Sequence, residues 1–289
     1  MAAAEVLIAG CGDIGGGLAL SLCAAGFTVT GLRRRAHLIP EGVEPLGADL
    51  AVPDSLTILS ERRFRYVVIA SAAAAYDAAS YRRVYVDGLR NLLRSLRGEP
   101  RLLLLSSTAV YHQHAGEWVD EDSPTAPGAF SGQLLLEAEA LLREHAPGRS
   151  TVLRLGGIYG PGRERLLREV RDGVGCPREP LRYSNRIHRD DCIGILRFLI
   201  DRLECGAKLA PVYLGVDDDP APIREVRHWL AARLGITLDD ALGGNGARMP
   251  GSKRCSNRRL RELGYQLLFP DFRAGYGALL DALRSTPPS

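Results

Sequence analysis

A pair of serines ends one of the most apolar runs of the chain and offers hydroxyl groups that could do chemistry. The run Arg101–Leu105 is followed directly by Ser106, Ser107 and Thr108. Such a run is typical of a buried strand of a parallel sheet, and ligands bind in these sheets at the carboxyl ends of the strands. We therefore predict that Ser107 and Thr108 lie at the edge of the sheet where ligands bind.

The second chemical feature is a glycine-rich turn near the start of the sequence. The apolar run Glu5–Ala9 leads into Gly-Cys-Gly-Asp-Ile-Gly, a helical apolar pattern follows up to Gly26, and another strand pattern begins at Phe27. In this context the Gly-x-Gly-x-x-Gly spacing indicates a dinucleotide site, because the glycines allow a tight turn and bring a pyrophosphate close to the N-terminus of the helix. We assign the pyrophosphate to these loop residues: Gly10, Gly12, Asp13, Ile14 and Gly15.

The end of the second strand pattern predicts which dinucleotide is bound. An NAD-preferring site places an acidic side chain here to bind the ribose hydroxyls, but this chain reads Arg33-Arg34-Arg35. A guanidinium binds a phosphate through two parallel hydrogen bonds. We therefore predict NADP(H) as the cofactor, with Arg33 and Arg34 on its additional phosphate. Three consecutive arginines cannot all reach one ligand, so at least one should face solvent.

Further strand and helix patterns alternate along the chain. Strand patterns cover Phe64–Ser71, Arg101–Ser107, Thr151–Leu155 and Pro211–Gly215, and helix patterns cover Tyr81–Arg97, 131–145 and Ile223–Leu234. This alternation predicts an α/β fold with a doubly wound parallel sheet, the Rossmann arrangement, and a smaller C-terminal substrate-binding part. We expect residues 1–160, with the strand near 211–215, to form the dinucleotide-binding domain, and 161–289 to be mainly the substrate-binding part. Ala70 and Ser71, at one strand end, should contact the cofactor.

Four segments together carry a resemblance to a known family: the glycine loop, Ser106–Tyr111, the Tyr-Gly-Pro loop at 159–161 and Ile187–Asp191. The chain resembles an atypical bacterial branch of the extended short-chain dehydrogenase/reductase (epimerase/dehydratase-like) family over essentially its whole length. The resemblance implies a Rossmann fold, Asp49 near the adenine ring, Ser107 as the catalytic serine, and a substrate region after the Tyr-Gly-Pro loop. Asp190 or Asp191 is expected to cap the helix Cys192–Leu203.

The sequence departs from this family at two places. The family carries a Tyr-x-x-x-Lys helix downstream of the serine, but residues 128–137 contain neither residue, and neither Lys208 nor Lys253 follows a tyrosine by four positions. Members that act on sugar nucleotides carry an arginine three residues before the Ile-His pair, where this chain has Ser184. We therefore expect a small polar carbonyl or alcohol as the substrate.

Turnover would then need a proton donor from outside that helix. Tyr159 is the first candidate, because it follows a strand end and a charge such as that of Arg163 could stabilise its ionised form; a packing role for its ring is the alternative. His112, His114 and His188 are rivals, since imidazole titrates near neutrality. The residues expected to contact the substrate are Thr108, His112, Arg186 and His188.

Composition and charge argue against several other classes of function. The net charge of +3 comes mostly from arginines spread along the chain, which argues against nucleic acid as a partner. No apolar run approaches the roughly 20 residues of a membrane span, the first residues lack the basic region of a signal peptide, and the six cysteines show no metal-ligand spacing. We expect a cytoplasmic protein with a small-molecule substrate and no metal, and the sequence leaves a homodimer open. The alternative is a non-catalytic NADP(H)-binding sensor or scaffold, which would not need the missing Tyr/Lys pair.

Overall fold

The computed structural model describes residues 5–242 and 251–285 of the 289-residue chain. The expectation about a signal peptide falls mainly on residues 1–4, which lie outside this part. The chain forms two compact units. The first unit comprises Met1–Val110, Thr125–Arg154 and Ile193–Tyr213, and the second comprises Tyr111–Pro124, Leu155–Cys192 and Leu214–Ser289. The chain therefore passes repeatedly from one unit to the other, whereas the sequence suggested one main boundary near residue 160.

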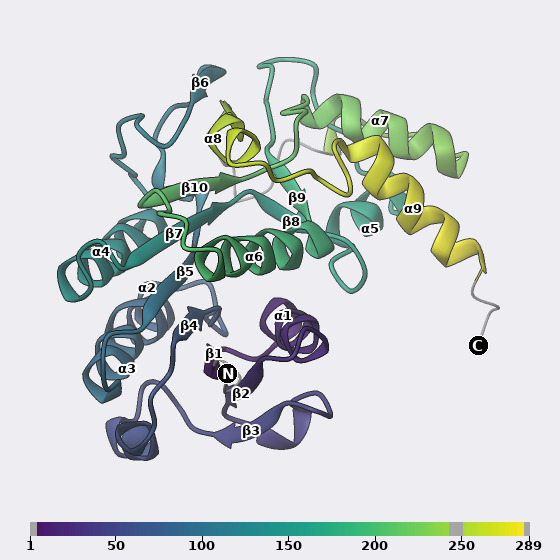
Figure 1. Ribbon diagram of the computed structural model, residues 1–289. Helices are drawn as coiled ribbons and strands as arrows, with labels where there is room; N and C mark the ends of the chain where they lie inside the picture. The colour runs from purple at the N-terminus through teal and green to yellow at the C-terminus, as the bar shows by residue number, and fades with distance from the viewer. Residues whose placement is uncertain (1–4, 243–250, 286–289) are drawn as a thin grey trace. The chain divides into compact units, whose positions relative to one another are not determined.

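A seven-stranded parallel sheet organises the first unit, which confirms the predicted Rossmann-like α/β fold (Figure 1). Its strands are β1 (Glu5–Ala9), β2 (Thr28–Arg33), β3 (Glu44–Gly47), β4 (Tyr66–Ile69), β5 (Arg101–Ser107), β7 (Ser150–Leu155) and β10 (Val212–Gly215), in the order β10-β7-β5-β4-β1-β2-β3. The order reverses between β1 and β4, because β1 pairs with both β2 and β4. The carboxyl ends of β1, β2, β4 and β5 therefore meet at one edge.

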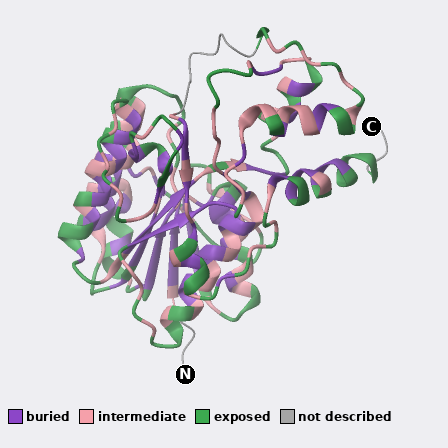
Figure 2. Ribbon diagram, turned by 90° about the horizontal axis from the view of Figure 1, so that it is seen from above, coloured by how far each residue is buried: buried purple, intermediate pink, exposed green. Residues whose placement is uncertain are grey.

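Helices cover both faces of this sheet. Helix α1 (Asp13–Ala24) and the part of α6 (Arg189–Glu204) from Ile193 onward lie on one face, where Arg197 donates a hydrogen bond to the carbonyl of Ser21 (Figure 1). Helices α3 (Leu89–Ser95) and α4 (Phe130–His145) lie on the other face. The inner strands are almost continuously buried, whereas the edge strand β3 is largely exposed (Figure 2). A sheet buried on both faces explains why its strands read as unbroken apolar runs.

The helix expected over Tyr81–Arg97 is present, but the prediction was wrong about its bounds and its pitch. The segment contains α2 (Ala78–Tyr81), a wider π-helical stretch, Arg82–Gly88, and then α3. A π turn holds one more residue than an α turn, and the apolar side chain buried in this stretch is that of Val86. Helical periodicity alone cannot reveal such a change of pitch.

The second unit is built from short elements. Strand β8 (Gly157–Tyr159) pairs with β9 (Arg186–His188), and β6 (Glu117–Val119) pairs with β11 (Lys253–Cys255), both in parallel. The helices are α5 (Arg165–Arg171), α7 (Ile223–Leu234), α8 (Arg258–Glu262) and α9 (Phe272–Ser285). The apolar faces of α5, α7 and α9 share one core, whose buried members include Tyr159, Leu167, Val226, Leu230, Phe272 and Tyr276.

The role expected for Asp190 or Asp191 was also wrong. Helix α6 begins at Arg189, so both aspartates lie in its first turn and not before it. The carboxylate of Asp191 is fully buried and accepts hydrogen bonds from the backbone N–H groups of Leu268 and Phe269 and from the hydroxyl of Tyr265. Asp191 therefore holds the loop that precedes α9.

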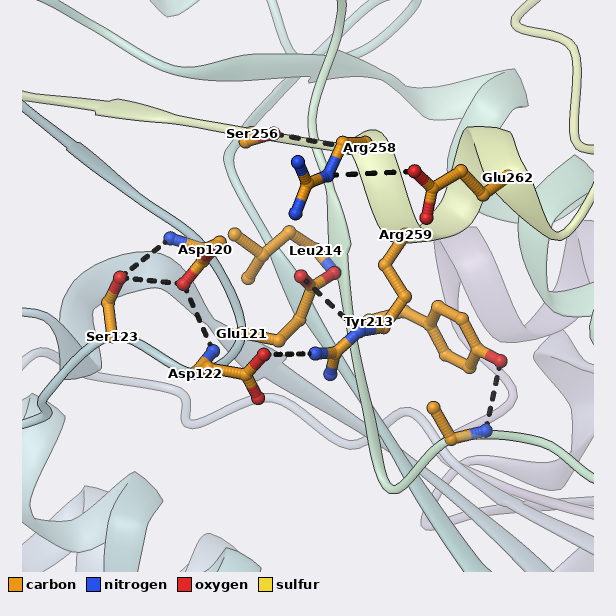
Figure 3. A network of polar contacts seen from close by, with 11 residues as sticks. Asp120, Glu121, Asp122, Ser123, Tyr213, Leu214, Ser256, Arg258, Arg259 and Glu262 are labelled. Carbon is orange, nitrogen blue, oxygen red and sulfur yellow. Dashed lines mark hydrogen bonds and ion pairs between the residues drawn. The ribbon is translucent and has the colours of Figure 1, made fainter.

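A network of polar contacts ties the segment Tyr111–Pro124 to the rest of the second unit (Figure 3). Arg259 on α8 forms an ion pair of 2.6 Å with Asp122, and the buried carboxylate of Glu121 accepts a hydrogen bond from the N–H of Leu214. Burial raises the pKa of Glu121, although these donors oppose the shift. The segment that follows Ser107 is therefore fixed by side chains from distant parts of the sequence.

Within residues 5–242 and 251–285, no helix has the length and apolar character needed to cross a membrane.

Candidate functional site

The glycine turn after β1 has the backbone geometry that a pyrophosphate site requires. Gly10 has a φ of +100°, and a Cβ added to it would lie 2.4 Å from the backbone nitrogen of Ser71. A Cβ on Gly15 would lie 2.3 Å from the carbonyl oxygen of Gly10. A Cβ on Gly12, in contrast, would meet no atom within 4 Å. Gly10 and Gly15 are therefore required by the fold, whereas Gly12 leaves space in front of the turn.

Helix α1 supplies hydrogen-bond donors to this space. It starts at Asp13, and Gly12, which precedes it, offers no side chain to cap its first N–H groups. The first N–H groups of a helix have no partner within the helix and carry the positive end of its dipole. The side chain of Asp13 is exposed and that of Ile14 is buried, so these two residues would hold a phosphate through their backbone. The residues present therefore fit the pyrophosphate of a dinucleotide.

The arginines after β2 differ in their surroundings. Arg33 is half-buried and its guanidinium donates to the carbonyl of Leu38 at 3.1 Å, which closes the turn behind it. Arg34 and Arg35 are exposed. No acidic residue occurs between Gly31 and Pro40. The end of β2 therefore offers positive charge and no carboxylate for a ribose.

Cys11 lies inside the glycine turn but is not a reactive thiol. Its side chain is fully buried, with its sulfur 2.7 Å from where a Cβ on Gly31 would be. Burial raises the pKa of Cys11 to about 11, although nearby Arg33 opposes the shift. Cys11 therefore fills the space beneath the end of β2.

The remaining residues predicted to contact the cofactor are Ala70, Ser71 and Asp49. The N–H of Ala70 and the hydroxyl of Ser71 both donate to the carbonyl of Ala9, so the end of β4 lies against the glycine turn. The carboxylate of Asp49 accepts from the N–H of Ala51 at 3.0 Å and pairs with Arg83 at 3.1 Å. Contact between Asp49 and an adenine ring stays a prediction.

Ser107 ends β5, at the same edge of the sheet. Its Oγ accepts a hydrogen bond of 3.1 Å from the N–H of Ala109. This is the local backbone contact that a strand-end serine commonly makes, and it leaves the hydroxyl proton of Ser107 available to an external acceptor. Thr108 is buried and opens the short helical turn Thr108–Val110. Ser107 is thus better placed than Thr108 to contact a ligand.

A buried polar cluster beneath this corner was missed by the sequence analysis. The carboxylate of Glu139 on α4 accepts hydrogen bonds from the hydroxyl of Ser106 at 2.7 Å and from the Arg154 guanidinium at 3.0 and 2.7 Å. All three side chains are buried. A buried carboxylate with this many donors joins α4 to β5 and β7. The only signal in the sequence was an acidic residue on the otherwise apolar face of a helix.

A tyrosine near the start of α4 was also missed. Tyr76, in the loop after β4, lies with its hydroxyl 3.2 Å from the hydroxyl of Ser131 in the first turn of α4. Its ring contacts that of Phe130, with centroids 5.0 Å apart. Tyr76 is 43% exposed whereas Ser131 is buried. The helix that lacks a tyrosine of its own therefore has one beside it, donated by another segment of the same unit.

Tyr159 belongs to the core of the second unit. It is 3% exposed, stacks on Tyr276 with centroids 4.3 Å apart, and its hydroxyl has no hydrogen-bond partner in the described part of the chain. Burial and the charge of Asp217 raise its pKa far above the usual value, and the cation that opposes this shift is Arg186 and not the expected Arg163. This geometry favours the packing role over proton transfer.

The other predicted substrate contacts also lie in the second unit. His112 is exposed. His188 is buried, its Nδ1 accepts from the N–H of Asp190 at 3.2 Å, and burial lowers its pKa, so its imidazole is neutral. Arg186 is buried, and its Nη1 has no hydrogen-bond partner in the described ranges. His112 is therefore the most accessible of the three.

Two further buried charged groups of the second unit were missed. Asp217 is buried, with no hydrogen-bond partner for either carboxylate oxygen among the described residues, and burial raises its pKa to about 8 against the opposing charge of Arg186. Lys253 is 5% exposed, its Nζ donates to the carbonyl of Tyr111 at 3.5 Å, and burial lowers its pKa. In the described residues, no group of histidine, cysteine, aspartate and glutamate side chains is arranged to hold a metal ion.

The sheet order, the glycine turn and the uncapped start of α1 define a dinucleotide-binding protein of the Rossmann class. The model of the NAD dependent epimerase/dehydratase family matches residues 6–172, and the chain belongs to this family. Its membership indicates an oxidoreductase or epimerase type of activity.

The similarity to known proteins extends over nearly the whole chain. A Methylobacillus flagellatus structure named for the NAD-dependent epimerases/dehydratases is 43% identical, with a TM-score of 0.83 over 98% of this chain and 99% of that one. Protein YeeZ of Escherichia coli K12 is 29% identical over 296 residues, which cover 92% of this chain and 97% of YeeZ. Human epimerase family protein SDR39U1 (isoform 2), solved with NADPH, is 25% identical, with a TM-score of 0.74 over 96% of this chain and 99% of that one. Two other structural neighbours, 21% and 20% identical to this chain, were solved with NAD.

Proposed function

We propose that this protein is an NADP(H)-dependent oxidoreductase or epimerase-like enzyme that acts on a small polar carbonyl or alcohol. The observation that carries the proposal is the pairing of two features at one edge of the sheet. Gly12 leaves free space before the uncapped start of α1, and β2 ends in Arg33, Arg34 and Arg35 with no carboxylate nearby. The first feature fits a pyrophosphate, and the second fits the additional phosphate of NADP(H).

Ser107 has the chemistry to bind the reacting oxygen of the substrate. Because its Oγ already accepts from the N–H of Ala109, its remaining hydroxyl proton is directed outward as a donor. A hydrogen bond to a carbonyl oxygen strengthens as negative charge develops there, which favours the transition state. The bound nicotinamide would supply or accept the hydride. Thr108 and His112 are the further residues that we propose for substrate contact.

The cofactor preference can be tested by calorimetric titration of the protein with NADPH and NADH. We expect NADPH to bind at least about ten-fold more tightly, since a charged hydrogen bond contributes about 1.5–3 kcal/mol. Arg34→Ala should weaken NADPH by about ten-fold and leave NADH unchanged. Arg34 is the cleaner position, because Arg33 also closes the turn to Leu38.

Arg35→Ala is the matched control for Arg34→Ala. Arg35 is equally exposed and adjacent in sequence, so a general loss of positive charge would affect both variants alike. We expect Arg35→Ala to change the affinity for NADPH by less than about two-fold. Equal affinities of the wild-type protein for the two cofactors would overturn the preference for NADP(H).

A second candidate function is a sensor or scaffold that binds NADP(H) without turnover. Two observations favour it: α4 carries neither tyrosine nor lysine in its first turns, and the phenol of Tyr159 is buried. The discriminating experiment is NADPH oxidation with a panel of small carbonyl compounds. Tight NADPH binding without oxidation by any of them would favour the sensor.

The cellular setting that we propose is the cytoplasm. All six cysteines are free thiols, which fits a reducing compartment. The partner that the proposed activity needs is its small-molecule substrate.

A further inference from the structure

The loop after β4 crosses the carboxyl edge of the sheet and brings a phenol to the helix that lacks one. It leaves the cofactor turn at Ser71, whose backbone nitrogen lies 2.4 Å from where a Cβ on Gly10 would be, and it reaches α4 at Tyr76. We propose that Tyr76 is the proton donor to the substrate oxygen, taking the place of the absent tyrosine of α4. The inference rests on the proposed function, because it assumes a carbonyl substrate and a nicotinamide cofactor.

A short chain of contacts connects Tyr76 with Ser107. The Tyr76 hydroxyl lies 3.2 Å from that of Ser131. The next residue, Gly132, packs so closely on the turn after β5 that an added Cβ would lie 2.5 Å from the carbonyl oxygen of Ala109. The N–H of the same Ala109 bonds the Oγ of Ser107. The phenol and the catalytic serine thus belong to one corner of the first unit.

The surroundings of Tyr76 suit proton transfer better than those of Tyr159. The Tyr76 ring is held against Phe130, while 43% of the residue stays accessible. A proton donor must contact the substrate and then recover its proton from solvent, and partial exposure permits both. The buried hydroxyl of Ser131 fixes the direction of the phenol through the 3.2 Å contact. Tyr159, at 3% exposure, can do neither.

In the reduction direction, NADPH would supply the hydride that forms the new C–H bond at the carbonyl carbon, and the π electron pair of the C=O bond would move to oxygen. That oxygen takes the phenolic proton of Tyr76 and becomes the alcohol, while Ser107 hydrogen-bonds it. The Tyr76 phenolate then takes a proton from solvent. The carbonyl, NADPH and one solvent proton are consumed, and the products are the alcohol and NADP+, with the phenol restored.

This assignment also explains how the chemistry can proceed without the missing lysine. A lysine beside a tyrosine favours the ionised phenolate, which is the base needed to oxidise an alcohol. Reduction of a carbonyl starts instead from the neutral phenol, so it does not need that cation. With Tyr76 as the proton donor, we therefore expect carbonyl reduction to be the favoured direction of the reaction.

Tyr76→Phe removes the hydroxyl and keeps the ring, which makes it the deciding variant. With NADPH and either dihydroxyacetone, glyceraldehyde or cyclohexanone as the probe, we expect kcat to fall by about 100-fold or more, since general acid catalysis contributes about 10²–10⁴. The KM and the Kd for NADPH should change by less than about two-fold, because the hydroxyl acts on the transition state. Tyr81→Phe, with its ring 5.5 Å from that of Tyr76, is the matched control and should retain kcat.

A second readout does not depend on turnover. The oxidised nicotinamide carries a positive charge, which stabilises a nearby phenolate. The measurement is the ultraviolet absorbance of the wild-type protein minus that of Tyr76→Phe. In this difference spectrum we expect the phenolate band to appear at lower pH with NADP+ bound than without cofactor. Circular dichroism and thermal melting show whether Tyr76→Phe is folded like the wild type.

The outcomes separate this inference from the proposed function. If the wild type reduces a probe and Tyr76→Phe does so equally well, Tyr76 is not the donor, while the enzyme function stands. If the wild type reduces none of the probes, the proposed activity fails for these carbonyls and the phenolate measurement decides about Tyr76. A phenolate signal that NADP+ does not move overturns the placement of Tyr76 at the nicotinamide.

Discussion

In the first unit the buried carboxylate of Glu139 accepts hydrogen bonds from Ser106 and from two nitrogens of the Arg154 guanidinium. In the second unit the buried carboxylate of Asp217 has no hydrogen-bond partner in the described part of the chain, and the buried ammonium of Lys253 makes one contact of 3.5 Å. Removing a charge from water is costly unless hydrogen bonds replace the lost hydration. Glu139 meets this condition, whereas Asp217 and Lys253 do not.

The difference separates two uses of buried charge. A carboxylate with all its partners in the fold, such as Glu139, connects elements and is part of the framework under the candidate site. A buried titratable group that lacks such partners is destabilising in its charged form, and such groups often mark functional regions. Asp217 and Lys253 therefore lower the stability of the second unit, and variants at these two positions should respond in the opposite way to variants at Glu139.

The largest effect is expected for Glu139→Ala in the first unit. This substitution removes the carboxylate that pairs with the buried guanidinium of Arg154, which should lower the free energy of unfolding by about 3–5 kcal/mol. Urea denaturation followed by circular dichroism measures the change. Glu137 lies on the same helix as Glu139 and forms an exposed ion pair with Arg82. Glu137→Ala should therefore lower the free energy of unfolding by less than about 1 kcal/mol. Equal losses in the two variants would show that burial of the Glu139 pair is unimportant.

Asp217→Asn should have a smaller effect and the opposite sign. The native pKa of Asp217 is raised from 3.8 to about 8, so the folded protein holds a proton that the unfolded chain has lost. Stability due to this group is therefore present below about pH 4 and decreases as the pH rises towards 8. An amide does not titrate, so Asp217→Asn should remove this decrease and stabilise the protein at pH 8 by at least about 1.4 kcal/mol, the value of one pKa unit.

Denaturation curves between pH 5 and pH 8 test this expectation, within the range set by the two pKa values. Asp219→Asn is the comparison. Asp219 is partly exposed and paired with Arg273, and its charge contributes less to the raised pKa of Asp217 than burial does, so its replacement should reduce the pH dependence only slightly. Parallel stability–pH curves for wild type and Asp217→Asn would contradict the assignment.

The smallest effect is expected at the two lysines. Lys253→Met replaces a buried ammonium by an apolar side chain of similar length, and should raise the free energy of unfolding by about 1 kcal/mol at neutral pH. Because burial lowers the pKa of Lys253, the stability of the wild type should increase as the pH rises through the alkaline range, and the variant should lose this increase. Thermal melts at several pH values measure both effects.

The exposed Lys208 supplies the comparison. Lys208→Met should change stability by less than about 0.5 kcal/mol at any pH, as expected of a surface position. A loss of more than about 2 kcal/mol in Lys253→Met would mean that the ammonium has partners that stabilise it, and the contrast between the units would then fail at this residue.

Most elements of the sheet could be predicted because they depend on local patterns. The run Arg101–Ser107 forms β5 with these bounds, and Ile223–Leu234 forms α7 with a left-handed Gly235 after it. Apolar runs, helical spacing and terminal glycines are properties of neighbouring residues. The glycine turn is predictable for the same reason, since its function follows from the spacing of three residues in one strand–helix unit.

The polar corner around α4 could not be predicted, because its contacts join distant residues. Tyr76 and Ser131 are 55 positions apart, and Ser106 and Glu139 are 33 apart. Tyr159 shows the opposite limitation: its motif is recognisable, but the sequence does not reveal that Tyr276 and Phe272 enclose it in a core. Burial decides whether a phenol can exchange a proton, and burial depends on the whole unit.

The interleaving of the two units determines when the first unit can be completed during synthesis. The last segment of the first unit, Ile193–Tyr213, comes after almost forty residues of the second. It contains most of α6, whose Arg197 binds the end of α1, and the start of the edge strand β10. A nascent chain that stops near residue 160 would therefore leave part of one apolar face and one edge of its sheet uncovered. Completion of the cofactor-binding unit during synthesis must wait for these residues, which gives this topology a large share of contacts between distant positions and a correspondingly slow folding step.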